Sequence, residues 1–168
     1  MSREPADDAR FQLMNQLADE VRANQRATAI VDELAGELMG VNRTDGRALD
    51  LLEQRGQMSA GELARESGLT TGAITGVVDR LERAGYARRV ADPSDRRRVL
   101  IEPTPKARTA STELFGPLSE LVVPILSRYT EEQIELLIEF NRLGREVQEQ
   151  HAEYLRERLR DPANVGKA

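Results

Sequence analysis

The sequence has no cysteine, no tryptophan and one histidine among 168 residues. Without cysteine, disulfide bonds, thiolate metal sites and thiol redox switches are excluded. His151 stands among glutamate, glutamine and alanine residues, which is typical of a solvated surface side chain rather than a catalytic base. This inventory lacks the usual zinc and iron ligands and leaves a Ser-His-Asp triad dependent on that one histidine. We therefore expect no enzyme, no metal and no cofactor.

Long apolar runs are also lacking. Charged residues make up 32% of the chain and hydrophobic residues 39%, and no run approaches the roughly 20 residues that span a bilayer. The first ten residues contain Glu4, Asp7 and Asp8 and no apolar centre, unlike a secretory signal. We expect one soluble, cytoplasmic domain over residues 1–168, since this length lies within the single-domain range.

The segment from Ser59 to Arg83 predicts two short helices joined by a tight turn. Ser59 and Glu62 have the spacing of a capping box, and Gly68 suits the left-handed end of the helix that begins there. Thr70 or Thr71 is expected to cap the second helix. Its apolar residues recur at three- and four-residue spacing and predict one buried stripe: Ile74, Val77, Val78 and Leu81.

The opposite face of this second helix is slim. Gly72 and Gly76 lie there despite the cost of glycine in a helix, close to Thr71 and Thr75. A helix that enters a DNA major groove, about 12 Å wide, needs such an edge with hydroxyl groups for bases and phosphates. An ordinary surface helix with tolerated glycines explains this segment equally well when the segment is taken alone.

The segment that follows is a basic hairpin. Tyr86–Ala91 and Val99–Glu102 predict two strands, joined by a turn that begins Asp92-Pro93 and carries three arginines. From residue 80 to residue 98, seven arginines against three acidic residues leave a local charge of +4 in a chain of net charge −5. A solvated charged loop is the usual meaning of such a run. A hairpin directly after a groove-sized helix instead favours contact with phosphates or with the minor groove.

Three stretches carry a family resemblance: Asn42-Arg43-Thr44-Asp45 before Ala48-Leu49-Asp50-Leu51-Leu52, Val78-Asp79-Arg80-Leu81-Glu82-Arg83-Ala84-Gly85-Tyr86, and Asp92-Pro93-Ser94-Asp95-Arg96-Arg97 before Val99-Leu100-Ile101. Together they resemble the MarR-type (multiple antibiotic resistance) winged-helix transcriptional regulators. The resemblance implies terminal helices that interleave around a twofold axis. It also implies a salt bridge between Asp95 and Arg97 at the wing tip, with the arginine in the minor groove. Pro103, Ala107 and Gly76 depart from the family pattern.

We therefore expect a mainly α fold with a small β-hairpin wing, in which a winged helix-turn-helix at 44–102 lies between dimerisation helices. These helices are expected at 6–40, as one or two helices, and at 104–160, and residues 161–168 are expected to fray. Thr44 is expected to cap the first helix of the motif. Gly116-Pro117 and Pro124 should bend or interrupt the helix that follows Thr104.

The last predicted helix begins at Thr130, which has capping-box spacing to Gln133, and it continues to about Arg160. A helix of roughly 30 residues spans about 45 Å, which is too long for the core of one subunit. Its apolar stripe therefore predicts a homodimer. A long helix packed entirely within one subunit is the alternative.

The predicted function is sequence-specific binding of double-stranded DNA by a transcriptional regulator, a ligand-responsive repressor that reads a pseudo-palindromic operator. The residues expected at the DNA are Thr70, Thr71, Gly72, Thr75, Arg80, Arg83, Asp95, Arg96 and Arg97. The resemblance places a small aromatic or lipophilic effector between the dimer helices and the winged helix, with candidate contacts that fit a plain core equally well: Phe11, Met14, Ile30, Leu34 and Phe115. The alternative function is a winged-helix protein-interaction module without DNA binding, because the chain is acidic overall.

Overall fold

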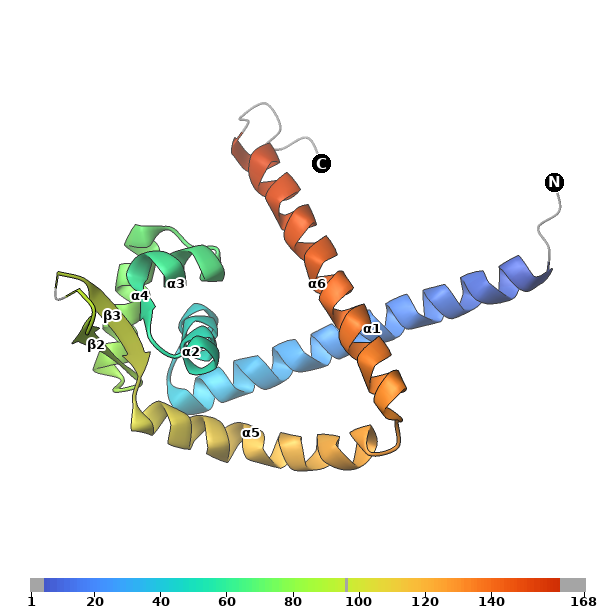
Figure 1. The fold of residues 1–168 in the computed structure, drawn as a ribbon, viewed down its shortest axis with the longest axis horizontal. Coiled ribbons are helices and arrows are strands. Elements are labelled where there is room, and N and C mark those ends of the chain that lie inside the picture. Colours follow the sequence, from blue (N-terminus) through green and yellow to red (C-terminus); the bar gives the residue numbers. More distant parts are fainter. Residues whose placement is uncertain (1–4, 96, 161–168) are drawn as a thin grey trace. The chain divides into compact units, whose positions relative to one another are not determined.

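The computed structural model describes residues 5–95 and 97–160. The chain divides into two compact units, residues 1–116 and 117–168, and the predicted tail at 161–168 lies outside the described residues. Mainly helical secondary structure with a small antiparallel sheet confirms the predicted fold class. The helices in chain order are α1 (Pro5–Met39), α2 (Arg43–Arg55), α3 (Ala60–Ser67), α4 (Thr71–Arg83), α5 (Pro105–Leu126) and α6 (Glu131–Arg160) (Figure 1).

The N-terminal segment forms one continuous helix of 35 residues, α1. It ends at Gly40, whose positive φ of 68° turns the chain toward α2. The cap of α2 is Asn42, whose side-chain oxygen accepts a hydrogen bond from the Asp45 amide at 3.0 Å. The prediction that Thr44 caps this helix is wrong, because the extended backbone needed at a cap lies two residues earlier, and Thr44 already belongs to the first turn.

The predicted helix-turn-helix caps are confirmed. The Ser59 hydroxyl accepts from the Glu62 amide at 3.2 Å, and the Glu62 carboxylate accepts from the Ser59 amide at 2.8 Å. Gly68 ends α3 in the left-handed conformation, with φ 71°. Thr70, rather than Thr71, caps α4 and accepts from the Ala73 amide at 3.2 Å. These local bonds fix where both helices of the motif begin.

The sheet has three antiparallel strands in the order β1 (Met58–Ser59), β3 (Val99–Pro103) and β2 (Ala87–Ala91). The hairpin of β2 and β3 was predicted, whereas β1 was not. Met58 pairs with Ile101 and brings the start of α3 onto the sheet. A two-residue strand shows no side-chain alternation in sequence, so its pairing arises only from tertiary contact.

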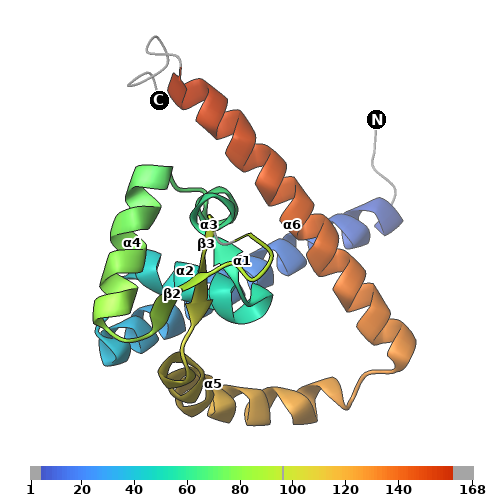
Figure 2. The ribbon, with the colours of Figure 1, turned by 60° about the vertical axis from the view of Figure 1, so that its left-hand side comes forward.

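The core of the first unit lies where α2, α3, α4 and the sheet meet (Figure 2). Its largest fully buried side chains include Leu52, Leu63 and Ile101. The predicted apolar stripe of α4 is confirmed, since every member is at most 1% exposed: Ile74, Val77, Val78 and Leu81. Packing of this stripe leaves the opposite face of α4 in solvent.

Helix α5 continues through Pro117 and Pro124. Of the two predicted effects of these prolines, a bend or an interruption, the interruption is therefore wrong. Its first turn is held by Thr104, whose hydroxyl accepts from the Ala107 amide at 3.3 Å and donates to the Gly85 carbonyl at 2.7 Å. The capping box predicted at the start of α6 is present, with Thr130 and Gln133 exchanging both hydrogen bonds. No residue of α6 is buried within the chain.

Candidate nucleic-acid interface and pocket

The first turns of α4 present an exposed polar edge. Thr70, Thr71, Gly72 and Thr75, which the sequence singled out, are all exposed there. The Thr75 hydroxyl donates to the Thr71 carbonyl at 3.1 Å, which leaves its oxygen lone pairs available to an outside donor. Four neighbouring small residues on one edge give the helix the narrow profile that a groove requires.

The glycines of α4 leave open space on this edge. A methyl group added at Gly72 would meet no atom within 4 Å, and one added at Gly76 would meet only Arg80 Nη1, at 3.4 Å. The fold itself therefore does not require glycine at either position. The open space beside these two glycines lets another molecule approach the backbone of α4 closely.

Gly72→Ala is expected to raise the free energy of unfolding by up to about 1 kcal/mol, because alanine is the better helix former and the site is open. The same methyl group should weaken DNA binding, since it occupies space needed at the groove. Thermal unfolding and fluorescence anisotropy with labelled operator DNA measure the two effects. Gly144→Ala in α6 is the matched control, because its added methyl group also meets no atom within 4 Å. Equal DNA affinity in the two variants would show that Gly72 does not lie at the DNA interface.

Arg80 is bound to a buried carboxylate. Its Nε and Nη2 atoms donate to both oxygens of Asp45, with the shortest distance 2.7 Å from Nη2 to Oδ1. Asp45 is 2% exposed, and its hydrogen bond with Arg80 raises the pKa of the guanidinium above its ordinary value. Arg80 thus connects α4 to α2, and its remaining nitrogen, Nη1, lies beside Gly76. The sequence predicted a DNA contact for Arg80 but did not anticipate this positioning contact.

The strand β2 is tied to α4 through Arg89. Its backbone amide donates to Glu82 at 2.8 Å, and its guanidinium donates to Glu82 and, at 2.8 Å, to Asp79. The hydrogen bond with Asp79 is the main cause of the raised pKa of Arg89. These contacts fix the root of the hairpin relative to the exposed face of α4.

The positive charge available to DNA is smaller than the arginine count indicated. Four of the seven arginines pair with acidic residues: Arg80 with Asp45, Arg88 with Glu102, Arg89 with Asp79 and Glu82, and Arg98 with Asp92. Among the described residues, Arg83 and Arg97 are exposed and form no ion pair. Arg96, also predicted at the DNA, lies outside the described residues. The free cations of this region are therefore at the end of α4 and at the tip of the hairpin.

The hairpin tip is built by carboxylates that accept from backbone amides. Asp92 accepts from the Ser94 amide at 2.8 Å and from its hydroxyl, and these bonds lower the pKa of Asp92. Asp95 accepts from the Arg97 amide at 3.0 Å. The family resemblance implies a salt bridge between the side chains of Asp95 and Arg97, but the described structure shows none between them. The Asp95 carboxylate instead accepts from the Arg97 backbone amide and closes an Asx-type turn. The Arg97 guanidinium therefore remains exposed.

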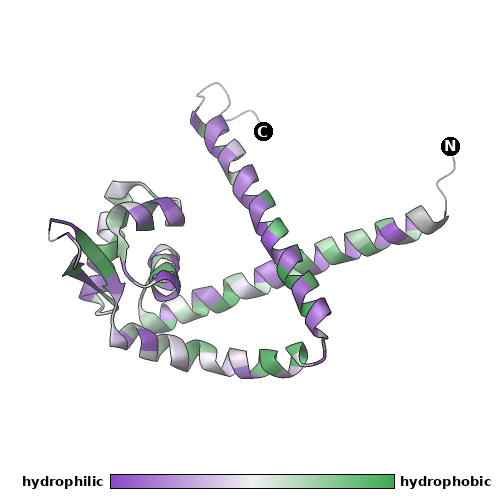
Figure 3. Ribbon diagram, viewed as in Figure 1, coloured by the Kyte–Doolittle hydropathy of each residue, from purple (hydrophilic) through white to green (hydrophobic). Residues whose placement is uncertain are grey.

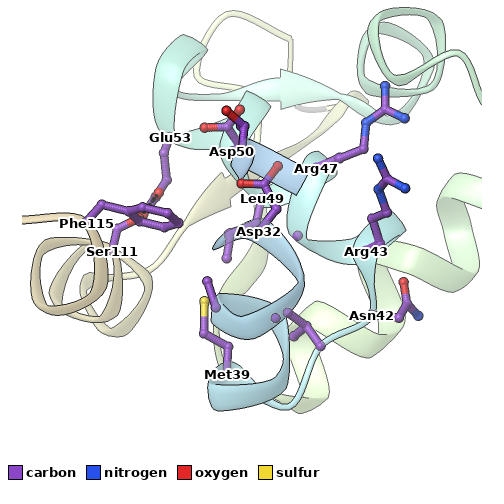
Figure 4. Close-up of a pocket in the computed structure, with 15 residues that line it drawn as sticks. Asp32, Met39, Asn42, Arg43, Arg47, Leu49, Asp50, Glu53, Ser111 and Phe115 are labelled. Carbon is purple, nitrogen blue, oxygen red and sulfur yellow. Dashed lines mark hydrogen bonds between the residues drawn. The ribbon is translucent and has the colours of Figure 1, made fainter. Parts of the chain in front are cut away.

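A cavity of about 340 Å³ lies between the C-terminal half of α1, helix α2 and the first half of α5 (Figure 4). Its apolar wall includes Ala35, Met39, Leu49 and Phe115. Its volume falls in the range of small-molecule sites. Within the first unit, the winged helix thus has a cavity directly behind α2.

Of the five residues predicted to contact an effector, Phe115 lines this cavity and the others do not: Phe11, Met14, Ile30 and Leu34. Because α1 is one continuous helix, Phe11 lies 28 residues, or about 42 Å along the helix axis, from Met39 at the cavity. Ile30 and Leu34 are nearer but are exposed to solvent, at 57% and 54%, and Ile30 lies two residues, about 200°, from both lining residues Thr28 and Asp32. The predicted set is therefore not brought together within one chain.

The sequence and structure of this region match known proteins. Residues 41–99, which cover α2 to α4 and most of the hairpin, match the model of the MarR family. Over 130 residues the chain is 40% identical to the HTH-type transcriptional regulator YcgE of Bacillus subtilis (strain 168), covering 77% of this chain and 84% of that protein. The chain belongs to the MarR family. It is a transcriptional regulator and not an enzyme, and this membership implies DNA binding.

Solved structures agree with the family. The transcriptional regulator BldR from Sulfolobus solfataricus is 33% identical and superposes with a TM-score of 0.51, over 86% of this chain and 99% of BldR. The apo form of MarR from E. coli is 17% identical, with a TM-score of 0.52 over 78% and 96% of the two chains, and shows the shared fold. The described helices of this MarR-family protein include none long and apolar enough to cross a membrane.

Proposed function

We propose that this MarR-family regulator binds a pseudo-palindromic operator as a homodimer, represses transcription there, and releases the DNA when a small ligand binds. The observation that carries DNA contact is the exposed edge of α4 beside a wing tip with an unpaired Arg97. In a dimer two such units would enter major grooves about 34 Å apart, one turn of the double helix. Each wing would then reach the adjacent phosphates or minor groove.

Dimerisation is supported by apolar side chains on the long helices. On α6 the exposed fraction is 71% at Leu159, 65% at Leu136 and 62% at Val147. Bands of hydrophobic residues recur along α1, α5 and α6 (Figure 3). Large exposed apolar surfaces in a water-soluble chain mark interaction sites, because their burial is favourable. A second copy of the chain offers the same helices and so a self-complementary partner.

Arg97→Ala is expected to weaken DNA binding without changing the thermal unfolding temperature, because the side chain is exposed and unpaired. Loss of one phosphate-type contact should reduce the slope of log affinity against log salt by about 1. Anisotropy titrations with a fragment of the protein's own promoter, at several salt concentrations, measure both effects. Asp95→Ala should act in the same direction but more weakly, since it loosens the turn that presents Arg97.

Arg128→Ala is the charge-matched control, because Arg128 is exposed between α5 and α6 and forms no ion pair among the described residues. It should leave the salt slope unchanged. If Arg97→Ala also retains the full affinity and slope, the wing has no part in DNA binding. If the unchanged protein shows no salt-dependent retention on DNA at all, the interaction-module alternative replaces operator binding.

Ligand control is supported by the position of the cavity behind α2. Lining residues on α2 include Arg43, Gly46 and Leu49, and the cap residue Asn42 lines it as well. The same helix holds Arg80 of α4 through Asp45. A ligand that shifts α2 would therefore move the recognition helix with it. A change from 1% to 99% released protein requires about 5.5 kcal/mol of differential binding between the two states.

A further inference from the structure

We propose that the cavity behind α2 selects a lipophilic cation, namely an apolar or aromatic body that carries a protonated amine. This inference rests on the proposed ligand response and specifies the chemistry of its ligand. The cavity joins two kinds of wall: the apolar residues around Met39 and Phe115, and the carboxylates of Asp32, Asp50 and Glu53. Hydrophobic bodies bury against the first, and a cation compensates the second.

Glu53 is the central acidic group of this wall. It is partly buried, and its Oε2 atom accepts a hydrogen bond from the Ser111 hydroxyl, which joins α2 to α5. Its other oxygen, Oε1, is buried and has no hydrogen-bond partner in the part of the chain that the structure describes. A buried carboxylate oxygen without a donor is costly, so a donor supplied by a ligand would be strongly favoured.

An ammonium group is the donor that fits this position. It brings up to three N–H groups and the positive charge that the carboxylate lacks. Glu53 lines the cavity, and the last torsion of a glutamate side chain is broad, so its carboxyl group can adjust to a ligand donor. Phe115, one helical turn after Ser111 on α5, contributes an aromatic ring to the same lining. Aromatic faces also attract cations.

The arginines of the lining lie on the other side of the cavity. Arg43 and Arg47 extend away from Glu53 and Phe115, whereas Asp50 and Asp32 lie nearer the glutamate (Figure 4). Asp50 already accepts from Gln54 at 2.8 Å, so its charge contributes to the potential more than its oxygens contribute to bonding. The end of the cavity lined by Phe115 is therefore anionic, which disfavours carboxylate ligands there.

Three probes with one ring system test the inference: 2-naphthylmethylammonium, 2-naphthylmethanol and 2-naphthoate. Isothermal titration of the full-length protein should show the ammonium binding about tenfold or more tighter than the alcohol, as expected for a charged hydrogen bond, and the carboxylate binding least. Glu53→Gln, which keeps the shape and removes the charge, should cancel the preference for the ammonium. Glu113→Gln is the control, because Glu113 is exposed on α5 outside the lining.

The outcomes separate this inference from the ligand response. If the alcohol or the carboxylate binds best, or if Glu53→Gln keeps the ammonium preference, the assigned class is wrong. If no probe binds, the inference is also overturned. Operator release is measured in parallel by anisotropy: release by naphthoate alone would support ligand response and refute the class. Tight, Glu53-dependent binding of the ammonium without release would support the class and refute ligand control of DNA binding.

Discussion

Operator binding is expected to be lost when Leu143 and Val147 of α6 are both replaced by glutamate. Both side chains are exposed in a single chain, at 46% and 62%, so the fold of one subunit should tolerate the charges. In a dimer the same carboxylates would be buried without partners in an apolar interface, and their desolvation would prevent the two subunits from associating. One recognition helix and one wing bury too little DNA for tight specific binding. Analytical ultracentrifugation measures the loss of the dimer, and fluorescence anisotropy measures the loss of operator binding.

Gln148→Glu with Gln150→Glu is the control, since it adds the same two charges to exposed polar positions of α6. It should remain dimeric and bind DNA. Removal of the chain from Thr130 onward should also abolish operator binding, and it should cause aggregation because the apolar side chains of α1 and α5 that we propose the dimer buries would stay exposed. A soluble monomer with the operator affinity of the intact protein, in either form, would contradict the obligate dimer.

Asp45→Asn is expected to lower both the thermal unfolding temperature and the affinity for DNA, the latter by about tenfold or more, because breaking a charge-assisted network is costly. The amide retains the shape of the side chain but offers Arg80 only one accepting oxygen and no charge. The recognition helix then loses its bidentate connection to α2. Asp50→Asn is the control, since Asp50 is exposed on the same helix.

A double substitution separates the two roles of Arg80. When Asp45→Asn is combined with Arg80→Gln, stability should recover relative to Asp45→Asn alone, because no unpaired guanidinium remains beside the neutral amide. DNA affinity should stay low if Arg80 Nη1 also touches the operator. Recovery of DNA affinity in the double variant would show that neither an operator contact of Arg80 nor its ion pair with Asp45 is needed for DNA binding.

Local signals in the sequence were enough to place the winged helix-turn-helix. The Ser59 and Thr70 caps, the left-handed Gly68 and the stripe from Ile74 to Leu81 depend on neighbours within one or two turns, and the structure confirms them. The burial of Asp45 could also have been predicted from the sequence. This residue lies four and seven residues before Leu49 and Leu52, both buried, so its helical face alone predicts that this carboxylate is buried.

Other features are set by contacts between residues far apart in the chain, and sequence patterns do not contain them. The partner of Asp45 is 35 residues away, β1 pairs across 43 residues, and the Glu53 carboxylate meets Ser111 across 58. The positive charge that residues 80–98 offer to DNA is likewise reduced by Asp45, Asp79 and Glu102, which lie outside that segment. Helix starts and buried faces follow from short-range hydrogen bonding and periodicity, whereas the positions of ion pairs and cavities follow from how the finished elements pack.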